Sequence, residues 1–311
     1  MTVGLVWDER YLAHQAPQHV ESPERLKAIR KAIEAAGLWD RLVHIQPAAV
    51  DEACLLRVHS RKHVAAVRAS AHSKELLWLD GDTYACRKSY ETALLAAGGL
   101  CAAADAVMKG EVRSAFCAVR PPGHHATRDR AMGFCLFNNV AVAVRHVQAV
   151  HGIHRVLIVD WDVHHGNGTQ AAFYRDADVA YVSVHQWPLY PGTGSADERG
   201  EGPGAGRTLN LPLKAGSGDR EFLAALDAGL AFGEKFRPEF IFISAGFDAH
   251  RDDPLGDLAV TEDGYAEATR RVRRVADRCA AGRIVSTLEG GYGEDALGRS
   301  VVAHLKALLA P

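Results

Sequence analysis

The chain has 311 residues, of which 48% are hydrophobic and 24% are charged, and its formal net charge at pH 7 is −2. This composition supplies enough apolar surface for a packed core, and it gives no electrostatic reason to expect binding to nucleic acid or to an anionic membrane. There is no apolar run of the roughly 20 residues needed to cross a bilayer. The N-terminus lacks the features of a signal peptide, and the six cysteines form no CxxC pair, so we expect reduced thiols in a cytoplasmic protein.

Predicted strands and helices alternate along the chain, and each later strand is followed directly by polar residues. A first strand is expected at Val3–Asp8, and a helix follows from Ser22, as its N-cap, to Gly37. Further strands are expected at residues 114–119, 155–159, 179–184, 208–213, 240–243 and 283–288, and helices at 89–109, 138–151, 166–174, 220–236 and 262–280. This alternation predicts an α/β fold with a mainly parallel sheet flanked by helices, in one domain over residues 1–311. Ligands of such sheets bind beyond the carboxyl ends of the strands.

The stretch RVLIVDWDVHHGNG (Arg155–Gly168) carries the strongest chemical signal. Its apolar run is typical of a strand buried on both faces, and Asp160, Asp162 and His164 then follow at spacing two. Alone, each is more simply explained as a turn-capping aspartate or a solvated histidine. Together with Asp248, which follows another strand, they favour a metal site with Asp162, His164 and Asp248 as ligands. One imidazole and two carboxylates suit Zn²⁺ and tolerate Fe²⁺ or Co²⁺.

Two further motifs lie at predicted strand ends. His124 and His125 follow Arg-Pro-Pro-Gly, and we interpret them as a general acid and base, although adjacent histidines are often plain surface residues. Asp160 could orient one of these imidazoles. Tyr292 ends the segment Glu-Gly-Gly-Tyr; it is either a packed residue after a glycine turn or a hydroxyl donor to a developing oxyanion.

Five segments, taken in order, resemble the histone deacetylase superfamily, and in particular its class II branch with the bacterial histone deacetylase-like amidohydrolases. They are RPPGHHA, GFCLFNN, VDWDVHHGNGTQ, SAGFDAHRDDPLG and LEGGY, and the resemblance extends from about Val3 to the C-terminus. It implies a three-layer arginase/deacetylase fold and one Zn²⁺ held by Asp162, His164 and Asp248. It also implies hydrolysis of a short acylamide, such as acetyl-lysine, by metal-activated water to give acetate and a free amine.

The same resemblance implies roles for other residues. His124 and His125 would handle protons, Tyr292 would polarise the acyl carbonyl, and Asn167 would pair with His125 where class I members have aspartate. Because asparagine is neutral, His125 should be less basic than in class I. The substrate tunnel would be lined by Gly133, Phe134 and Tyr190. An inner K⁺ site is implied at Asp160, Asp162, His164, Ser183 and Val184, and a second K⁺ site around Phe173, Asp176, Val179 and Arg207.

The substrate stays open between an acetylated lysine side chain and an acetylated small amine such as a polyamine. Leu255, at the position where polyamine-preferring members carry an acidic residue, favours acyl-lysine. Asp82, expected near the rim, could instead attract a cationic amine. A non-catalytic acyl-ligand binding protein is the alternative of another class, and the intact metal set and Tyr292 argue against it. We expect no direct nucleic-acid or membrane partner, and the sequence is compatible with a homo-oligomer.

Overall fold

The computed structural model describes residues 1–311 and is built around an eight-stranded sheet. Its strands are β1 (Val3–Val6), β2 (Val43–His44), β5 (Ser114–Cys117), β6 (Val156–Asp160), β7 (Val179–Gln186), β8 (Thr208–Leu213), β9 (Phe240–Ala245) and β10 (Ile284–Leu288). They lie in the order β2-β1-β5-β10-β9-β6-β7-β8, and every neighbouring pair is parallel. A small antiparallel pair, β3 (Leu77–Trp78) and β4 (Tyr84–Ala85), stands apart. The expected parallel sheet is therefore confirmed.

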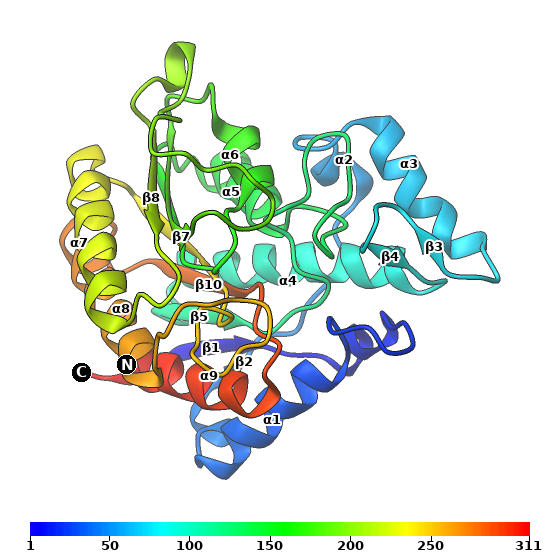
Figure 1. Cartoon of the computed structure of the whole chain (residues 1–311), viewed down its shortest axis with the longest axis horizontal. Coiled ribbons are helices and arrows are strands. Elements are labelled where there is room, and N and C mark those ends of the chain that lie inside the picture. Colours follow the sequence, from blue (N-terminus) through cyan, green and yellow to red (C-terminus); the bar gives the residue numbers. More distant parts are fainter.

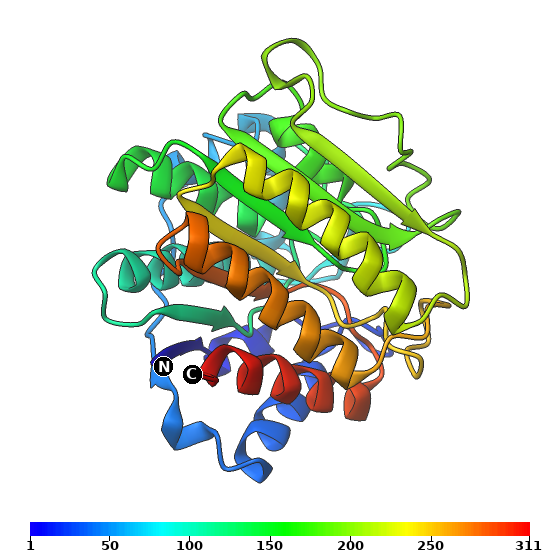
Figure 2. The ribbon, with the colours of Figure 1, turned by 90° about the vertical axis from the view of Figure 1, so that its left-hand side faces the viewer.

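Helices cover both faces of the sheet (Figures 1 and 2). In chain order they are α1 (Glu24–Ala35), α2 (Glu52–Leu55), α3 (Arg61–Ala69), α4 (Ser89–Met108), α5 (Asn139–His151), α6 (Asn167–Phe173), α7 (Asp219–Phe236), α8 (Glu262–Cys279) and α9 (Glu294–Leu309). Short 3-10 helices lie at Glu9–Ala13, Trp39–Arg41, Ser70–His72 and Gly202–Gly204. Figure 2 shows α7, α8 and α9 side by side over one face, with α4, α5 and α6 behind the other. The result is three layers, with α1 packed outside α9.

The inner strands are apolar because both of their faces are covered. All residues of β5, β6, β9 and β10 are buried, and so are all eight residues of β7. Such strands carry few polar side chains, since a buried polar group needs a partner. Polar residues therefore gather where the strands stop, at one edge of the sheet.

Several boundaries differ from the sequence pattern. Strand β7 continues through His185, because Ser183 Oγ (2.9 Å) and the Gly194 carbonyl (3.0 Å) satisfy both nitrogens of this buried imidazole. The prediction that Ser22 is the N-cap of α1 is wrong: the N-cap is Pro23, the helix begins at Glu24, and no side chain caps it. Helix α9 and the β3–β4 pair have no counterpart among the expected elements.

Helix α4 also corrects an expectation about apolar segments. It is 20 residues long and apolar enough by length and composition to cross a membrane, although no such run was expected. In this structure 72% of the qualifying window is buried within the protein. Its small residues pack against the sheet and α5, which is the setting of a core helix.

Candidate active site

The loops after five neighbouring strands, β5, β10, β9, β6 and β7, meet at the carboxyl edge of the sheet and, with the β3–β4 turn, enclose a pocket of about 250 Å³. It is lined by Asp82, Pro122, His124, His125, Gly133, Phe134, His164, Leu189, Tyr190, Leu255, Gly290 and Tyr292. Eight predicted catalytic or substrate-binding residues are in this set. A larger surface groove of about 690 Å³ between α1, α8 and α9 is lined mainly by alanines and exposed charged side chains, and it contains no comparable chemistry.

Asp162, His164 and Asp248 converge at the base of this pocket, with one potential ligand atom from each within 4.8 Å of the others. Asp162 Oδ2 accepts a hydrogen bond from the Gly290 N–H (2.7 Å), and Asp248 Oδ1 accepts one from the Val163 N–H (2.9 Å). Asp248 Oδ2 is buried without a hydrogen-bond partner and lies 3.2 Å from His164 Nδ1. A buried carboxylate oxygen without a donor is costly, and a cation would compensate it. The donor set therefore fits a divalent metal ion such as Zn²⁺.

The pKa values of these side chains also favour a bound cation. Burial, together with the charge of Asp162, raises the pKa of Asp248 to about 7. Burial alone would lower the pKa of His164, but the hydrogen bond to Asp162 and the nearby Asp248 carboxylate raise it to about 10. In the absence of a metal, protonation of His164 thus supplies the positive charge that two buried carboxylates require.

A glycine lets the backbone approach these carboxylates. A Cβ placed on Gly290 would collide with Asp248 Oδ2 and crowd Asp162 Oδ2 (2.7 Å). A side chain here would therefore fill the space between the two carboxylates. The Gly-Gly pair before Tyr292 is accordingly part of the site as well as a turn.

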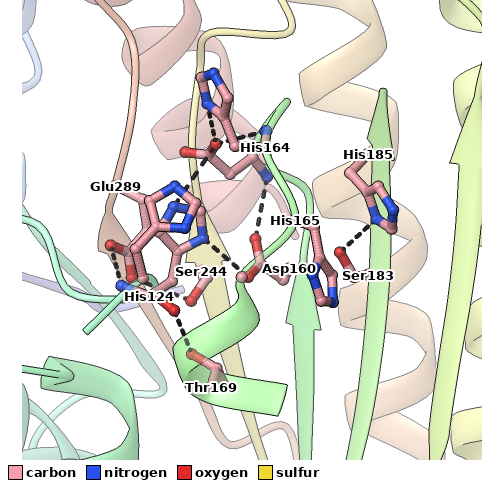
Figure 3. Close-up of polar contacts among 12 residues, drawn as sticks. His124, Asp160, His164, His165, Thr169, Ser183, His185, Ser244 and Glu289 are labelled. Carbon is pink, nitrogen blue, oxygen red and sulfur yellow. Dashed lines mark hydrogen bonds and ion pairs between the residues drawn. The ribbon is translucent and has the colours of Figure 1, made fainter. Parts of the chain in front are cut away.

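The two adjacent histidines have different partners. His124 Nδ1 lies 3.1 Å from Asp160 Oδ2, which also accepts a hydrogen bond from the Tyr181 hydroxyl (3.1 Å). His125 Nδ1 lies 2.8 Å from Asn167 Oδ1. Figure 3 shows His124 beside Asp160, joined to it by a dashed line. One imidazole is thus paired with a carboxylate and the other with a neutral amide, as the resemblance to the family implies.

These partners separate the two imidazoles in basicity. Burial alone would lower the pKa of His124, but the carboxylates of Asp162 and Asp160 raise it to about 10. Burial and the nearby His124 and His164 hold the pKa of His125 well below its ordinary value. At neutral pH His124 therefore carries the proton, and His125 is free to accept one.

Glu289 is a site residue to which the sequence analysis gave no role. Its Oε2 accepts hydrogen bonds from the N–H groups of Gly123 (2.7 Å) and His124 (3.1 Å), and its Oε1 accepts one from Ser244 Oγ (3.1 Å) (Figure 3). This buried carboxylate joins the loop after β5 to the ends of β9 and β10. Burial raises its pKa to about 7. The signal was available, because Glu289 is a charged residue directly after an apolar strand.

Tyr292 is held from two sides by residues that were also not predicted. Its N–H donates to Asp253 Oδ2 (2.6 Å), and the other oxygen of Asp253 accepts from the Leu255 N–H (3.0 Å). The Arg25 guanidinium lies 4.8 Å from the centre of the Tyr292 ring and donates to the Gly291 carbonyl (2.6 Å). Asp253 lies in the segment SAGFDAHRDDPLG and Arg25 near the N-terminus, both far from Tyr292 in the sequence, so the residues around Tyr292 give no sign of these contacts.

The pocket walls are aromatic. Phe134 packs edge-on against Tyr292, with ring centres 5.8 Å apart, and Tyr190 packs edge-on against His125 at 5.1 Å. Tyr190 is 39% exposed and so reaches the mouth of the pocket. Gly133 has a φ of +54°, and a Cβ there would collide with the His125 ring. The absence of a side chain at this position keeps both the loop and the imidazole in place.

The two predicted potassium sites differ in their surroundings. Asp160, the last residue of β6, is in register with Ser183 on β7, next to Val184, so the inner set lies where the end of β6 adjoins β7. In the outer set, which also contains Phe173, Val179 and Arg207, the Asp176 carboxylate is already paired with Arg145 at 2.7 Å. Potassium binding stays a prediction at both places.

Comparison with known proteins agrees with this geometry. The histone deacetylase domain family matches residues 19–308. A probable deacetylase from Methanothermobacter thermautotrophicus is 44% identical over 98% of this chain and 90% of its own, and a histone deacetylase-like amidohydrolase from Pseudomonas aeruginosa is 43% identical over 90% of this chain and 74% of its own. The crystal structure of the HDA15 HD domain superposes with a TM-score of 0.94 at 41% identity, covering 99% of this chain and 89% of that one. The chain therefore belongs to the histone deacetylase family and has the arginase/deacetylase fold of a deacetylase or amidohydrolase enzyme.

Proposed function

We propose that the protein is a zinc-dependent deacetylase that hydrolyses the amide of an acetylated lysine side chain to acetate and the free amine. The observation that carries the proposal is the convergence of Asp162, His164 and Asp248 below a pocket that also presents two imidazoles and a phenol. A divalent cation held there would polarise the acyl carbonyl and lower the pKa of a water molecule.

The histidine pair supplies the proton transfers. His125, neutral because of its lowered pKa, takes the proton from the attacking water and passes it to the nitrogen of the breaking C–N bond. His124, charged beside Asp160, stays protonated and stabilises the negative charge that develops on the acyl oxygen. The separation of basicity between the two imidazoles is therefore what divides the two roles.

Tyr292 completes the site as a hydrogen-bond donor to the same oxygen. Burial raises the pKa of its hydroxyl well above the ordinary value, so the phenol keeps its proton at working pH. Asp253 fixes the backbone at Tyr292, and Phe134 packs against its ring. A donor that is already positioned does not have to reorganise as charge develops, and this is the source of its catalytic effect.

The pocket favours a lysine side chain. It is small, at about 250 Å³, and its apolar lining residues Phe134, Leu189, Tyr190 and Leu255 suit a chain of methylene groups. Asp82 also lines the pocket, and its carboxylate favours a second candidate substrate, an acetylated polyamine with a distal ammonium group. A comparison of an acetyl-lysine peptide with acetylspermidine and acetylputrescine separates the two candidates, and a large preference for the polyamines would reject acetyl-lysine as the substrate.

Metal dependence is tested by removal and replacement. The protein is dialysed against a chelator, assayed on an acetyl-lysine peptide, and then assayed again after addition of one equivalent of Zn²⁺. We expect activity to disappear and to return. Asp248→Ala should lose the zinc of the pocket and turnover, whereas Asp263→Ala, which removes an exposed carboxylate from the first turn of α8, should keep both. Full activity in the demetallated protein would refute the proposal.

A further inference from the structure

A second group of metal-ligand side chains lies outside the pocket, on the helices that cover one face of the sheet. Asp105 is in the last turn of α4, and His146 and His151 are on the C-terminal half of α5. The two helices pack against each other (Figure 1). Helix α5 starts after the loop that carries His124 and His125, and it runs back to the start of β6. Its C-terminus therefore lies at the edge of the sheet opposite the pocket. We propose that Asp105, His146 and His151 form a second site for a transition-metal cation.

The geometry of the three side chains carries this proposal. The Nε2 atoms of His146 and His151 each lie 2.7 Å from Asp105 Oδ1, and one donor atom of each residue lies within 4.8 Å of the others. The two imidazole rings are 5.9 Å apart and nearly perpendicular, so their nitrogens point at one place from different directions. In a tetrahedral zinc site, ligand atoms about 2.1 Å from the ion lie about 3.4 Å apart. Moving each imidazole about 0.7 Å further from the carboxylate oxygen makes room for the ion.

Burial also suits a bound ion. The side chains of His146, His151 and Asp105 are 16%, 18% and 32% exposed. The cluster is thus held by its surroundings and still open to solvent, so an ion can enter and water can complete its coordination. Two helices supply the ligands, which means that binding would link the end of α4 to the end of α5.

The local charge favours a cation. Asp105 has no lysine or arginine partner, since its only ion-pair partners are the two histidines. Arg145, next to His146 in the sequence, is paired with Asp176 (2.7 Å), and Arg113, the arginine nearest to Asp105 in the sequence, is paired with Asp277 (2.6 Å). Both helices also end beside the cluster, α4 at Met108 and α5 at His151 itself, and helix C-termini carry partial negative charge.

The ligand chemistry identifies the class of ion. Two imidazoles and one carboxylate favour Zn²⁺, Co²⁺, Ni²⁺ or Cu²⁺ over Mg²⁺ or Ca²⁺, which prefer sites made only of oxygen atoms. The site is independent of the proposed catalytic ion, because it shares no residue with the pocket.

The test is zinc stoichiometry. Protein preloaded with one zinc per chain is dialysed against micromolar Zn²⁺, and bound metal is counted by elemental analysis. We expect the unaltered chain to take up one further zinc, and His146→Gln and His151→Gln each to lose it. His154→Gln is the matched control: this histidine is exposed, lies three residues beyond His151 and is outside the cluster, so its variant should keep the further zinc.

Deacetylase activity and circular dichroism report whether each variant is folded, since no altered residue lies in the pocket. Asp105→Asn keeps the size of the side chain and removes its charge, and it should weaken the affinity for the further zinc at least tenfold. The thermal midpoint gives an independent measure, because added Zn²⁺ should raise it in the unaltered chain and not in His151→Gln. The proposal would be overturned if the unaltered chain bound no further zinc. It would also be overturned if the His146→Gln and His151→Gln variants bound as much zinc as the unaltered chain.

Discussion

The pairing of His125 with a neutral amide makes a sharp prediction about pH dependence. In Asn167→Asp, a carboxylate replaces the amide whose Oδ1 lies 2.8 Å from His125 Nδ1. Two opposite charges about 4 Å apart interact by about 4 kcal/mol at an effective dielectric constant near 20. At 1.36 kcal/mol per unit this corresponds to about 3 pKa units. Because residue 167 is only half-buried, solvent screening and the desolvation of the new carboxylate reduce the expected shift to about 1–2 units.

The sign follows from the role of His125. Burial and neighbouring imidazoles hold its pKa well below the ordinary value, so it is neutral and can accept a proton over a wide pH range. A new carboxylate favours the protonated form and raises that pKa. The fraction of His125 able to act as base then falls at acidic pH, and the acidic limb of the kcat/KM profile moves to higher pH.

The assay is kcat/KM for an acetyl-lysine peptide between pH 5 and 9, with zinc content measured in each variant. Asn167→Ala is the control, because it removes the hydrogen bond without adding charge and should lower the rate without moving the acidic limb upward. An acidic limb in Asn167→Asp that stays in place, or moves to lower pH, would contradict the assignment of His125 as the base.

Four further changes have defined outcomes. Tyr292→Phe should lower kcat by about 10²–10³ with zinc content unchanged, as expected for the loss of one oxyanion donor; an unchanged kcat would exclude that role. Gly133→Ala should reduce kcat at least tenfold, since its new methyl group meets the His125 ring at a backbone φ of +54°, and steady-state kinetics together with a thermal midpoint will separate loss of the site from loss of the fold. Burial alone would raise the pKa of Glu21, but buried arginines lower it to about 2, so its contribution to stability is present above about pH 4.5 and is lost as pH falls through about 2. Urea unfolding should therefore show that the parent chain loses about 3 kcal/mol between pH 5 and pH 2 that Glu21→Gln does not lose, and equal pH slopes would argue against the ion pair. Asp82→Asn should slow acetylspermidine hydrolysis by up to about fivefold and leave a neutral acetyl-lysine peptide unaffected, because a partly exposed charge contributes at most about 1 kcal/mol; equal effects on both substrates would remove Asp82 from amine recognition.

The sequence by itself determined the strand ends and the chemistry that follows them. A strand covered on both faces must be apolar, so the change from Ile158 and Val159 to Asp160 and Asp162 marks the edge of the sheet without any structure. Because the strands are parallel, all such changes fall on one edge, and this is why Asp248 could be grouped with residues more than eighty positions away. The pattern did not place α9, which packs on α1 and α8. It also missed the continuation of β7 through His185, because a histidine is stable inside a buried strand only once the Ser183 hydroxyl and the Gly194 carbonyl are in place.

Only the tertiary structure decided which groups support the site and how basic its imidazoles are. Glu289, Asp253 and Arg25 act through hydrogen bonds to backbone groups of other segments. The position of Glu289 after an apolar strand marks it as a candidate, but the partners of these three side chains leave no mark in local residue spacing. The pKa of His125 depends on burial and on the charges around it, which exist only once several strand ends have come together. Periodicity along the chain can locate a catalytic residue, but its proton affinity is a property of the packed surroundings.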